Sequence, residues 1–263
     1  MLRVLFIGDI ITPRAADFLT KSLWSIRRRL EVDFVTVNGE NASFLGGISR
    51  EAAEALLSGG ADCITGGNHT LQTRSIYPML EEGRGVLRPL NYPDQAPGCG
   101  YSILPIGSAR LLVISALGTV YMEPGLADPL PFIERVLARE EGKYDLSLVD
   151  LHAEATGEKL TVAHALDGRV SAVIGTHTHV PTADEQILPG GTAYLSDVGM
   201  CGPSGGILGV APRVMLERSR THIRVPYAEA VGPIVANAAI IDLDETSGKA
   251  VAIRRISFSE DGI

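Results

Sequence analysis

Short runs of hydrophobic residues alternate along the first part of the chain with segments whose apolar positions recur at helical spacing. Residues 2–7, 34–37 and 62–65 are predicted strands. The segment 13–30 is a predicted helix opened by a proline, and Ser49 is suited to cap a second helix that ends at Gly59-Gly60. Alternation of strands and helices favours an α/β fold with a mainly parallel sheet and right-handed crossovers.

The rest of the chain continues with strand and helix patterns. Further strands are predicted at 101–104, 111–114, 144–149, 170–174, 192–196, 238–243 and 251–256, and further helices at 128–138 and 153–166. The first two of these strands, separated by Pro105 and Gly107, are expected to be antiparallel. Residues 221–225 alternate in period two and are also expected in a strand. Without a linker-like change of composition or an internal repeat, residues 1–263 are predicted to form a single domain.

Composition narrows the class of protein. The chain is 45% hydrophobic and 21% charged over 263 residues, which is ordinary for a globular protein with a sizeable core. A net charge of −8 argues against a broad surface for nucleic acid or for an anionic membrane, although a small cationic pocket for a nucleotide remains open. The protein is predicted to be cytoplasmic, because its three cysteines are far apart in the sequence, its N-terminus is unlike a signal peptide and no apolar run approaches about 20 residues.

Polar residues follow the predicted strands in a repeated way. The segment Gly175-Thr-His-Thr-His179 follows the strand 170–174, and residues two apart in an extended chain project to one side. The carboxyl ends of parallel strands meet at one edge of a sheet, so the residues after these strands are expected to converge. The residues in question are Asp9, Glu40, Asn41, Asn68, His69, His152, His177 and His179. The simpler alternative is a set of unrelated loop histidines and turn carboxylates.

A mixed oxygen and nitrogen set of this size exceeds the needs of one tetrahedral ion. It suits two divalent transition metals, bridged by a carboxylate and about 3.5–4 Å apart, the arrangement used for hydrolysis of phosphoesters. Imidazole suits zinc, iron, nickel or copper, while carboxylate and amide oxygens also admit manganese. Residue types alone leave the metal open.

The motifs, taken together, resemble the signature set of the YmdB-like metallophosphoesterases, within the calcineurin-like phosphoesterase superfamily. They are Gly8-Asp9, Asn38-Gly-Glu-Asn41, Gly66-Gly-Asn-His69, Asp150-Leu-His-Ala-Glu-Ala-Thr156, Gly175-Thr-His-Thr-His179 and Asp197-Val-Gly-Met200. The resemblance runs in order over nearly the whole chain. It implies a four-layer α/β/β/α sandwich and a di-metal phosphodiesterase or phosphatase. The expected substrates are small phosphoesters or nucleotides, 2′,3′-cyclic nucleotides above all, attacked by a hydroxide that bridges the metals.

The resemblance also implies a role for each residue. Asp9 and His179 would hold the first metal, with Asn41 nearby or ligated; Glu40 would bridge both; Asn68, His152 and His177 would complete the second. His69 would lie beside the scissile phosphate, where it would protonate the leaving oxygen or stabilise its charge. Iron is the first expectation for the two divalent ions, with manganese or zinc next. Asp197 and Glu154 are candidates to support the ligand histidines.

The sequence differs from most of the superfamily at one ligand position, and two alternative functions are compatible with it. Most of the superfamily has a histidine two residues after the first aspartate, where this chain has Ile11, so the first metal would have fewer nitrogen ligands. A regulatory or RNA-associated binding protein, with a structural or weakly active metal site, is the main alternative. An amidohydrolase ranks below it, because the His-x-His pair comes late in the chain. A homo-oligomer is compatible with the sequence.

Overall fold

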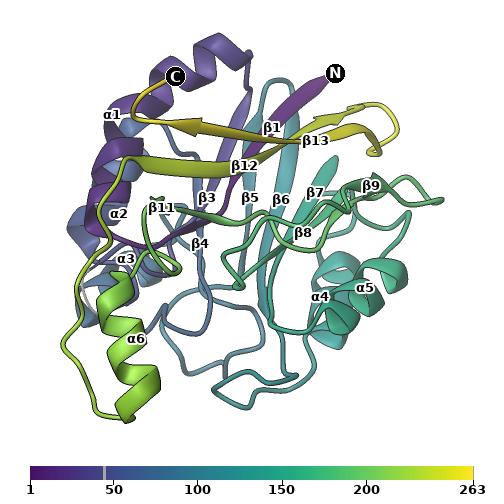
Figure 1. Cartoon of the computed structure of the whole chain (residues 1–263). Coiled ribbons are helices and arrows are strands. Elements are labelled where there is room, and N and C mark those ends of the chain that lie inside the picture. Colours follow the sequence, from purple (N-terminus) through teal and green to yellow (C-terminus); the bar gives the residue numbers. More distant parts are fainter. Residues whose placement is uncertain (44–45, 263) are drawn as a thin grey trace.

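The computed structural model, which describes residues 1–43 and 46–262, contains two β-sheets packed face to face (Figure 1). The first sheet comprises β1 (Leu2–Ile7), β2 (Asp9–Ile10), β3 (Phe34–Asn38), β4 (Cys63–Thr65), β11 (Met200–Pro203), β12 (Ile234–Leu243) and β13 (Ala250–Ser259). The second comprises β5 (Tyr101–Ile106), β6 (Ala109–Leu117), β7 (Leu146–His152), β8 (Ala172–Thr176), β9 (Gln186–Ile187) and β10 (Ala193–Leu195). The helices are α1 (Pro13–Leu30), α2 (Arg50–Gly59), the short 3-10 helix η1 (Arg74–Ile76), α3 (Tyr77–Glu82), α4 (Leu130–Arg139), α5 (Thr156–Ala165) and α6 (Pro212–Thr221).

Side chains of alternate strand residues build the layers. In β1, Leu5 and Ile7 pack with α1 and α2, whereas Val4 and Phe6 point to the other face and pack between the two sheets. The outer face of the second sheet packs against α4 and α5, where Ile133 and Val162 are buried. Three hydrophobic cores therefore separate four layers. The fold is the four-layer α/β/β/α sandwich that the family resemblance implies.

Strand order brings the functional segments to one edge. The first sheet has the order β2-β11-β12-β1-β3-β4, with β13 paired to β12, and the second has the order β5-β6-β7-β8-β10-β9. Strands β1, β3 and β4 run parallel, as do β6, β7, β8 and β10. Asn38 at the end of β3 donates to Asp150 in β7 through a 2.9 Å hydrogen bond, so the carboxyl ends of the two sheets meet.

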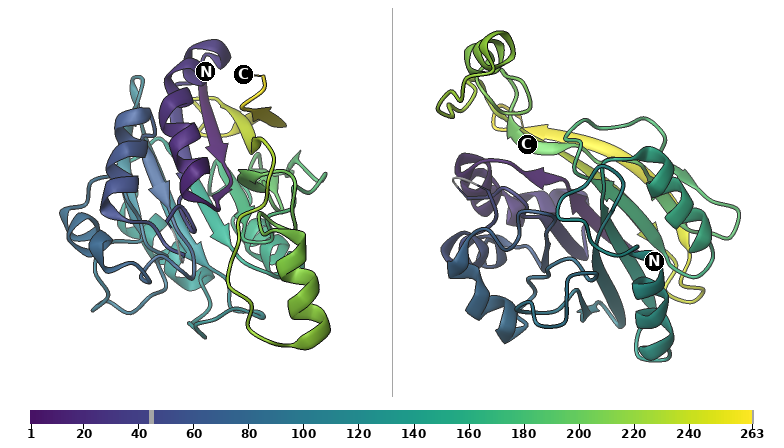
Figure 2. Two further views of the ribbon diagram at one scale, coloured as in Figure 1. Left: turned by 60° about the vertical axis from the view of Figure 1, so that its left-hand side comes forward. Right: turned by 90° about the horizontal axis from the view of Figure 1, so that it is seen from below.

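One expectation about the backbone holds in part and another is wrong. Parallel strands form the middle of the second sheet and part of the first, but they are divided between two sheets, and β12 lies antiparallel beside β1. Residues 221–225 are not a strand: α6 runs to Thr221, and His222 ends it with a left-handed φ of 56°. Its N–H bonds to Arg218 O at 2.9 Å, so the turn is a helix cap. Helix α6 buries only Val214 and stands away from the sheets (Figure 2).

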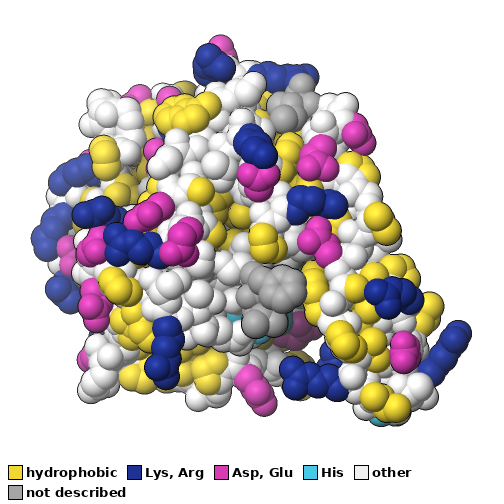
Figure 3. All heavy atoms as spheres, turned by 90° about the vertical axis from the view of Figure 1, so that its left-hand side faces the viewer, with side chains coloured by type: hydrophobic (Ala, Val, Ile, Leu, Met, Phe, Trp, Pro, Cys, Tyr) yellow, Lys and Arg dark blue, Asp and Glu magenta, His cyan; other side chains and the backbone are white. Residues whose placement is uncertain are grey.

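Two surface features bear on the expected partners. No helix among residues 1–43 and 46–262 is long and apolar enough to cross a membrane. On the face that Figure 3 shows, Lys and Arg side chains lie intermixed with Asp and Glu side chains.

Candidate metal centre

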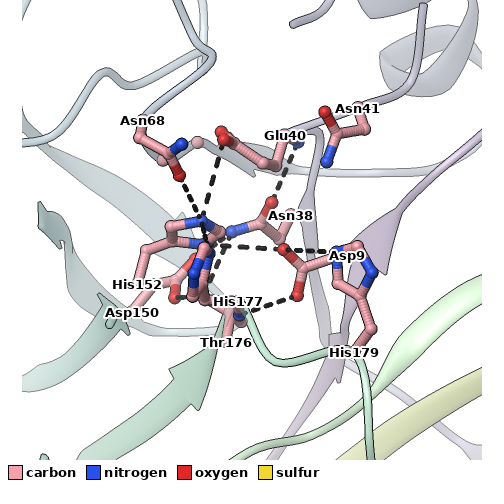
Figure 4. Close-up of polar contacts among 12 residues, drawn as sticks. Asp9, Asn38, Glu40, Asn41, Asn68, Asp150, His152, Thr176, His177 and His179 are labelled. Atoms are coloured by element: carbon pink, nitrogen blue, oxygen red, sulfur yellow. Dashed lines mark hydrogen bonds and ion pairs between the residues drawn. The ribbon is translucent and has the colours of Figure 1, made fainter. Parts of the chain in front are cut away.

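Ligand-type side chains from both sheets converge on His152, the last residue of β7 (Figure 4). Its Nε2 lies 3.1 Å from Asn68 Oδ1, 3.1 Å from His177 Nδ1 and 3.7 Å from Glu40 Oε1. Asn68 follows β4, Glu40 follows β3 and His177 follows β8, so the partners of His152 all come shortly after strands. Ligand atoms held about 2.0–2.2 Å from one ion lie roughly 3–3.6 Å from one another, which is close to these separations.

Asp9 and His179 extend this group on its other side. Asp9 Oδ1 lies 3.5 Å from His152 Nδ1 and 4.0 Å from His179 Nε2. Both imidazoles thus border the same carboxylate. The group as a whole therefore brings together the six residues Asp9, Glu40, Asn68, His152, His177 and His179.

In each of the carboxylates of Asp9 and Glu40, one oxygen accepts a hydrogen bond and the other has no hydrogen-bond partner among the described residues. Asp9 Oδ2 accepts from the backbone N–H of His177 at 3.2 Å, and Glu40 Oε1 accepts from the backbone N–H of His69 at 2.6 Å. The other oxygens, Asp9 Oδ1 and Glu40 Oε2, are buried and have no hydrogen-bond partner within the described residues. Buried unpaired carboxylate oxygens are costly unless a cation neutralises them.

Burial also shifts the pKa values of this group toward the neutral form of each side chain. Desolvation, with a contribution from the charge of Asp197, raises the pKa of Asp9 from 3.8 to about 7. Desolvation raises the pKa of Glu40 well above its usual value. The pKa of His152 is well below its ordinary value, chiefly because that ring is fully buried. Neutral imidazoles are the metal-binding form, and a bound cation would favour ionised carboxylates.

A hydrogen-bond relay fixes the tautomer of His152. Thr176 Oγ1 donates to Asp150 Oδ1 at 2.7 Å, so this hydroxyl accepts from His152 Nδ1, which lies 2.9 Å away. His152 Nε2 then carries a lone pair, yet it faces the Asn68 amide oxygen and the Glu40 carboxylate, which are also acceptors. A cation between these atoms resolves the conflict. The residues present therefore fit divalent metal ions.

Side chains of the described residues do not, as they stand, form a group of three His, Cys, Asp or Glu in position to hold an ion. Asn68, whose amide is not one of these residue types, is one of the four side chains that meet at His152 Nε2, with His152, His177 and Glu40. The distances from His152 Nε2 to His177 Nδ1 and to Glu40 Oε1 are close to those between two ligands of one ion.

Gly67 makes the convergence possible. A Cβ at Gly67 would lie 2.2 Å from His152 Cδ2, so only glycine lets this loop pass the imidazole.

The His177-Thr178-His179 segment does not have the extended backbone that was expected. Strand β8 ends at Thr176, and His177 and His179 have φ values of 104° and 67°. Positive φ is rare for residues with a Cβ and is maintained only where the surroundings impose it. Here Asp197 Oδ2 accepts from Thr178 N at 2.9 Å. The two imidazoles therefore reach the centre from a strained turn rather than from one side of a strand.

The supporting residues differ in part from those predicted. Asp197 does not bond to a ligand histidine; it pairs with buried Lys159, 3.0 Å from its Nζ, and positions the histidine turn. Glu154 Oε2 lies 3.3 Å from His177 Nε2, rather than beside His152. The relay through Asp150 and Thr176 was not predicted. Both lie inside the sequence motifs, and their neighbouring histidines were the only available signal.

His69 and Asn41 lie at the margin of the group. Asn41 Oδ1 is 2.7 Å from His69 Nδ1, so the amide contacts this imidazole, and His69 Nδ1 is also 3.2 Å from Glu40 Oε1. Donation from Nδ1–H to Asn41 leaves the other ring nitrogen, Nε2, available to a ligand. Both residues line a cavity of about 510 Å³ beside the centre, together with His179 and residues near α6.

Protein free of metal is expected to lose stability as the pH rises from about 4 to about 7. Burial raises the pKa of both Asp9 and Asp150 from 3.8 to about 7, so in this interval the folded state binds more protons than the unfolded state. The contribution of these two carboxyl groups to the free energy of unfolding is greatest below pH 3.8 and is lost as the pH rises through about 7. Urea unfolding at several pH values measures the slope.

The Asp9→Asn variant provides the control for this pH dependence. It removes one of the two raised carboxyl pKa values, so its stability should fall less steeply over the same interval. Divalent metal added at pH 8 should restore stability to the unaltered chain, because the ion binds the ionised carboxylates. An identical slope in both proteins would contradict the role given to Asp9.

Known proteins match this fold over nearly its whole length. The family model described as YmdB-like protein matches residues 5–256. The chain is 37% identical over 260 residues to the 2′,3′-cyclic-nucleotide 2′-phosphodiesterase of Bacillus subtilis (strain 168), covering 99% of this chain and 98% of the relative. A crystal structure of a hypothetical protein from Thermus thermophilus superposes with a TM-score of 0.90 and 41% identity, over 98% of this chain and 100% of that one. A novel phosphatase from Mycoplasma pneumoniae has a TM-score of 0.90 and 29% identity, over 98% and 93%.

The four-layer sandwich and the mixed carboxylate, amide and imidazole centre at its strand ends define a metallophosphoesterase, a phosphoric ester hydrolase that employs divalent metal ions. Within that class, the match over residues 5–256 and the identity to the bacterial relatives show that the chain belongs to the YmdB-like family. The resemblance inferred from the sequence motifs is thereby confirmed.

Proposed function

We propose that this protein hydrolyses 2′,3′-cyclic nucleotides at a centre of two divalent metals. The observation that carries the proposal is the pair of buried oxygens, Asp9 Oδ1 and Glu40 Oε2, which have no hydrogen-bond partner among the described residues and belong to carboxylates that border the imidazoles of His152 and His179. The substrate class is supported by the 37% identity to a relative named 2′,3′-cyclic-nucleotide 2′-phosphodiesterase. In this proposal Asp9 and His179 would hold one ion, Asn68, His152 and His177 would hold the other, Glu40 would serve both, and Asn41 would contribute at the first ion or through His69.

The two ions, when bound, supply activation of water and neutralisation of the phosphate charge. The chain contributes orientation and proton transfer. Thr176 and Asp150 keep the lone pair of His152 on Nε2, and the backbone N–H of His69 holds one oxygen of Glu40 in place. Asn41 Oδ1 accepts from Nδ1–H of His69 and fixes its ring, so that Nε2, when the imidazole is protonated, can donate a hydrogen bond or a proton to the leaving oxygen.

The cavity beside the centre suits a nucleotide in size. Its volume of about 510 Å³ lies within the range of roughly 300–1,000 Å³ that is usual for small-molecule sites. Its lining includes His69 and His179 as well as Leu208, Arg218 and Tyr227, of which Arg218 belongs to α6. Arg218 places a cation and Tyr227 an aromatic ring where the rest of a nucleotide would lie. This lining supports a nucleotide in preference to inorganic or very small phosphoesters.

The remaining parts of the proposal concern metal, location and organisation. The family resemblance favours iron, with manganese or zinc as alternatives, and the nitrogen and oxygen donors admit each of these metals. Three free cysteines, Cys63, Cys99 and Cys201, support action in the cytoplasm. The return of β12 and β13 to the sheet that contains β1 supports one domain over residues 1–263.

Metal stripping tests the proposal. Elemental analysis of purified protein should find about two transition metals per chain, as a two-metal hydrolytic centre requires. Chelation should abolish hydrolysis of bis-p-nitrophenyl phosphate and 2′,3′-cyclic AMP, and iron or manganese should restore it. One metal or none, with no turnover after iron or manganese is returned, would favour a binding protein instead.

A further inference from the structure

A second cavity, of about 540 Å³, lies where the segment 88–100 meets α4. Three arginines line it, Arg88, Arg135 and Arg139, with Asp94 as the acidic residue in the lining. None of the residues assigned to the metal centre lines it. We call it the arginine pocket. Its positive lining stands out in a chain whose net charge is −8.

Arg88 is the unusual member of this group. The residue is only 5% exposed, and its buried Nε has no hydrogen-bond partner among residues 1–43 and 46–262. Nη1 donates to the backbone oxygen of Pro89 at 2.9 Å, but no carboxylate of the described chain forms an ion pair with this guanidinium. Burial lowers the pKa of Arg88, which expresses the same cost. The charge of Asp94 acts on this guanidinium without a direct ion pair, and a buried cation that no carboxylate contacts is unfavourable, so the position favours an anion.

The other arginines can meet the same anion. The guanidinium of Arg135 lies 4.3 Å above the ring of Phe132, which holds it at the pocket without neutralising it. Arg139 Nε lies 3.2 Å from Glu140 Oε1, but Glu140 also binds Lys143 at 2.9 Å, so its charge is shared. Guanidinium groups bind phosphate oxygens through paired hydrogen bonds. Phe132 offers an apolar ring beside them.

We propose that the arginine pocket binds the phosphoryl group of a small anionic ligand, at a site separate from the metal centre. The phosphoryl group would pair with the Nε side of Arg88 and with Arg135. Two sources have this chemistry: inorganic phosphate, or a nucleoside monophosphate whose base lies against Phe132. The proposal does not depend on the reaction at the metal centre.

Calorimetric titration of the full-length protein with inorganic phosphate tests the proposal. The His177→Ala variant, with its metal centre disrupted, should still bind one phosphate per chain. Arg88→Met in that background should weaken this binding at least about tenfold, because charge-assisted hydrogen bonds are lost. Arg110→Gln is the matched control: this exposed arginine pairs with Asp145 outside the pocket, and phosphate affinity should not change.

A replacement variant and a titration with three ligands complete the experiment. Arg88→Met removes an unpaired buried charge and is expected to fold; if it does not, Arg135→Gln combined with Arg139→Gln replaces it, because both side chains are exposed. Titration with adenosine, AMP and phosphate separates the sources: tighter AMP binding supports a nucleotide, and equal affinity supports free phosphate. Loss of all phosphate binding in the His177→Ala protein, or unchanged affinity in the arginine variants, would overturn the proposal. If the metal centre itself were wrongly assigned, the effect of Arg88→Met would persist.

Discussion

Glu40→Gln is expected to lower kcat/KM at least about a thousandfold and to remove metal from the protein, because a carboxylate that neutralises two cations contributes several kcal/mol. Glu40 is 1% exposed, and its Oε2 has no partner in the described chain. Glutamine keeps the size of the side chain and the acceptor for the backbone N–H of His69, which lies 2.6 Å from Oε1. The change therefore removes charge while it preserves shape.

The same substitution should stabilise the protein once metal has been stripped away. The unaltered chain must bury a carboxyl group whose pKa desolvation raises well above its usual value. A neutral amide avoids that cost, so the stripped variant should melt at least about 2 °C higher than the stripped unaltered chain at pH 8. Added iron or manganese should raise the melting temperature of the unaltered chain and leave the variant unchanged.

Elemental analysis, turnover and thermal melting with and without metal check both effects. Glu141→Gln is the control, since this glutamate is exposed and its loss should alter neither metal content nor rate. A Glu40→Gln protein that keeps two metals and normal turnover would contradict the bridging position. Opposite effects on the stripped and the loaded protein are the signature of a carboxylate retained for metal binding at a cost in stability.

Hydrophobic periodicity was sufficient to predict most elements of this fold. Helix α1 spans Pro13–Leu30 as expected, with Thr12 Oγ1 accepting from Ala15 N, and Ser49 caps α2. These elements are set by local signals: caps, apolar spacing and, at the end of α2, Gly60. The division into two sheets is not local. It depends on the pairing of β1 with β12, which lie at opposite ends of the chain, and no short pattern encodes it.

The site shows the same division between local and distant causes. Strand-end motifs predicted that Asp9, Glu40, Asn68 and His152 would converge, because parallel strands end together. The positive φ values of His177 and His179 were not predictable, since nothing in a histidine favours that backbone. The turn depends on Asp197, whose carboxylate is held by Lys159 in a buried pair. Long-range contacts of this kind become visible only in three dimensions.

His69→Ala is expected to lower kcat for 2′,3′-cyclic AMP by about 10²–10⁴-fold while both metals stay bound, the usual range for loss of a positioned acid. His69 Nδ1 contacts Asn41 Oδ1 at 2.7 Å, and its ring is not among the groups around His152 Nε2. Its backbone N–H, which holds Glu40, is retained in alanine. Metal content and rate should therefore separate in this variant, whereas they fall together in Glu40→Gln.

The leaving group distinguishes proton donation from general support of the site. A ribose oxygen is a poor leaving group and needs a proton, whereas p-nitrophenolate is stable as an anion. His69→Ala should thus slow cleavage of 2′,3′-cyclic AMP far more than cleavage of bis-p-nitrophenyl phosphate, and added imidazole should restore part of the rate with the cyclic nucleotide. His164→Ala, which changes an exposed histidine of α5, is the control and should leave both rates unchanged. Equal losses with both substrates would assign His69 to charge stabilisation, and full retention of rate would remove it from the reaction.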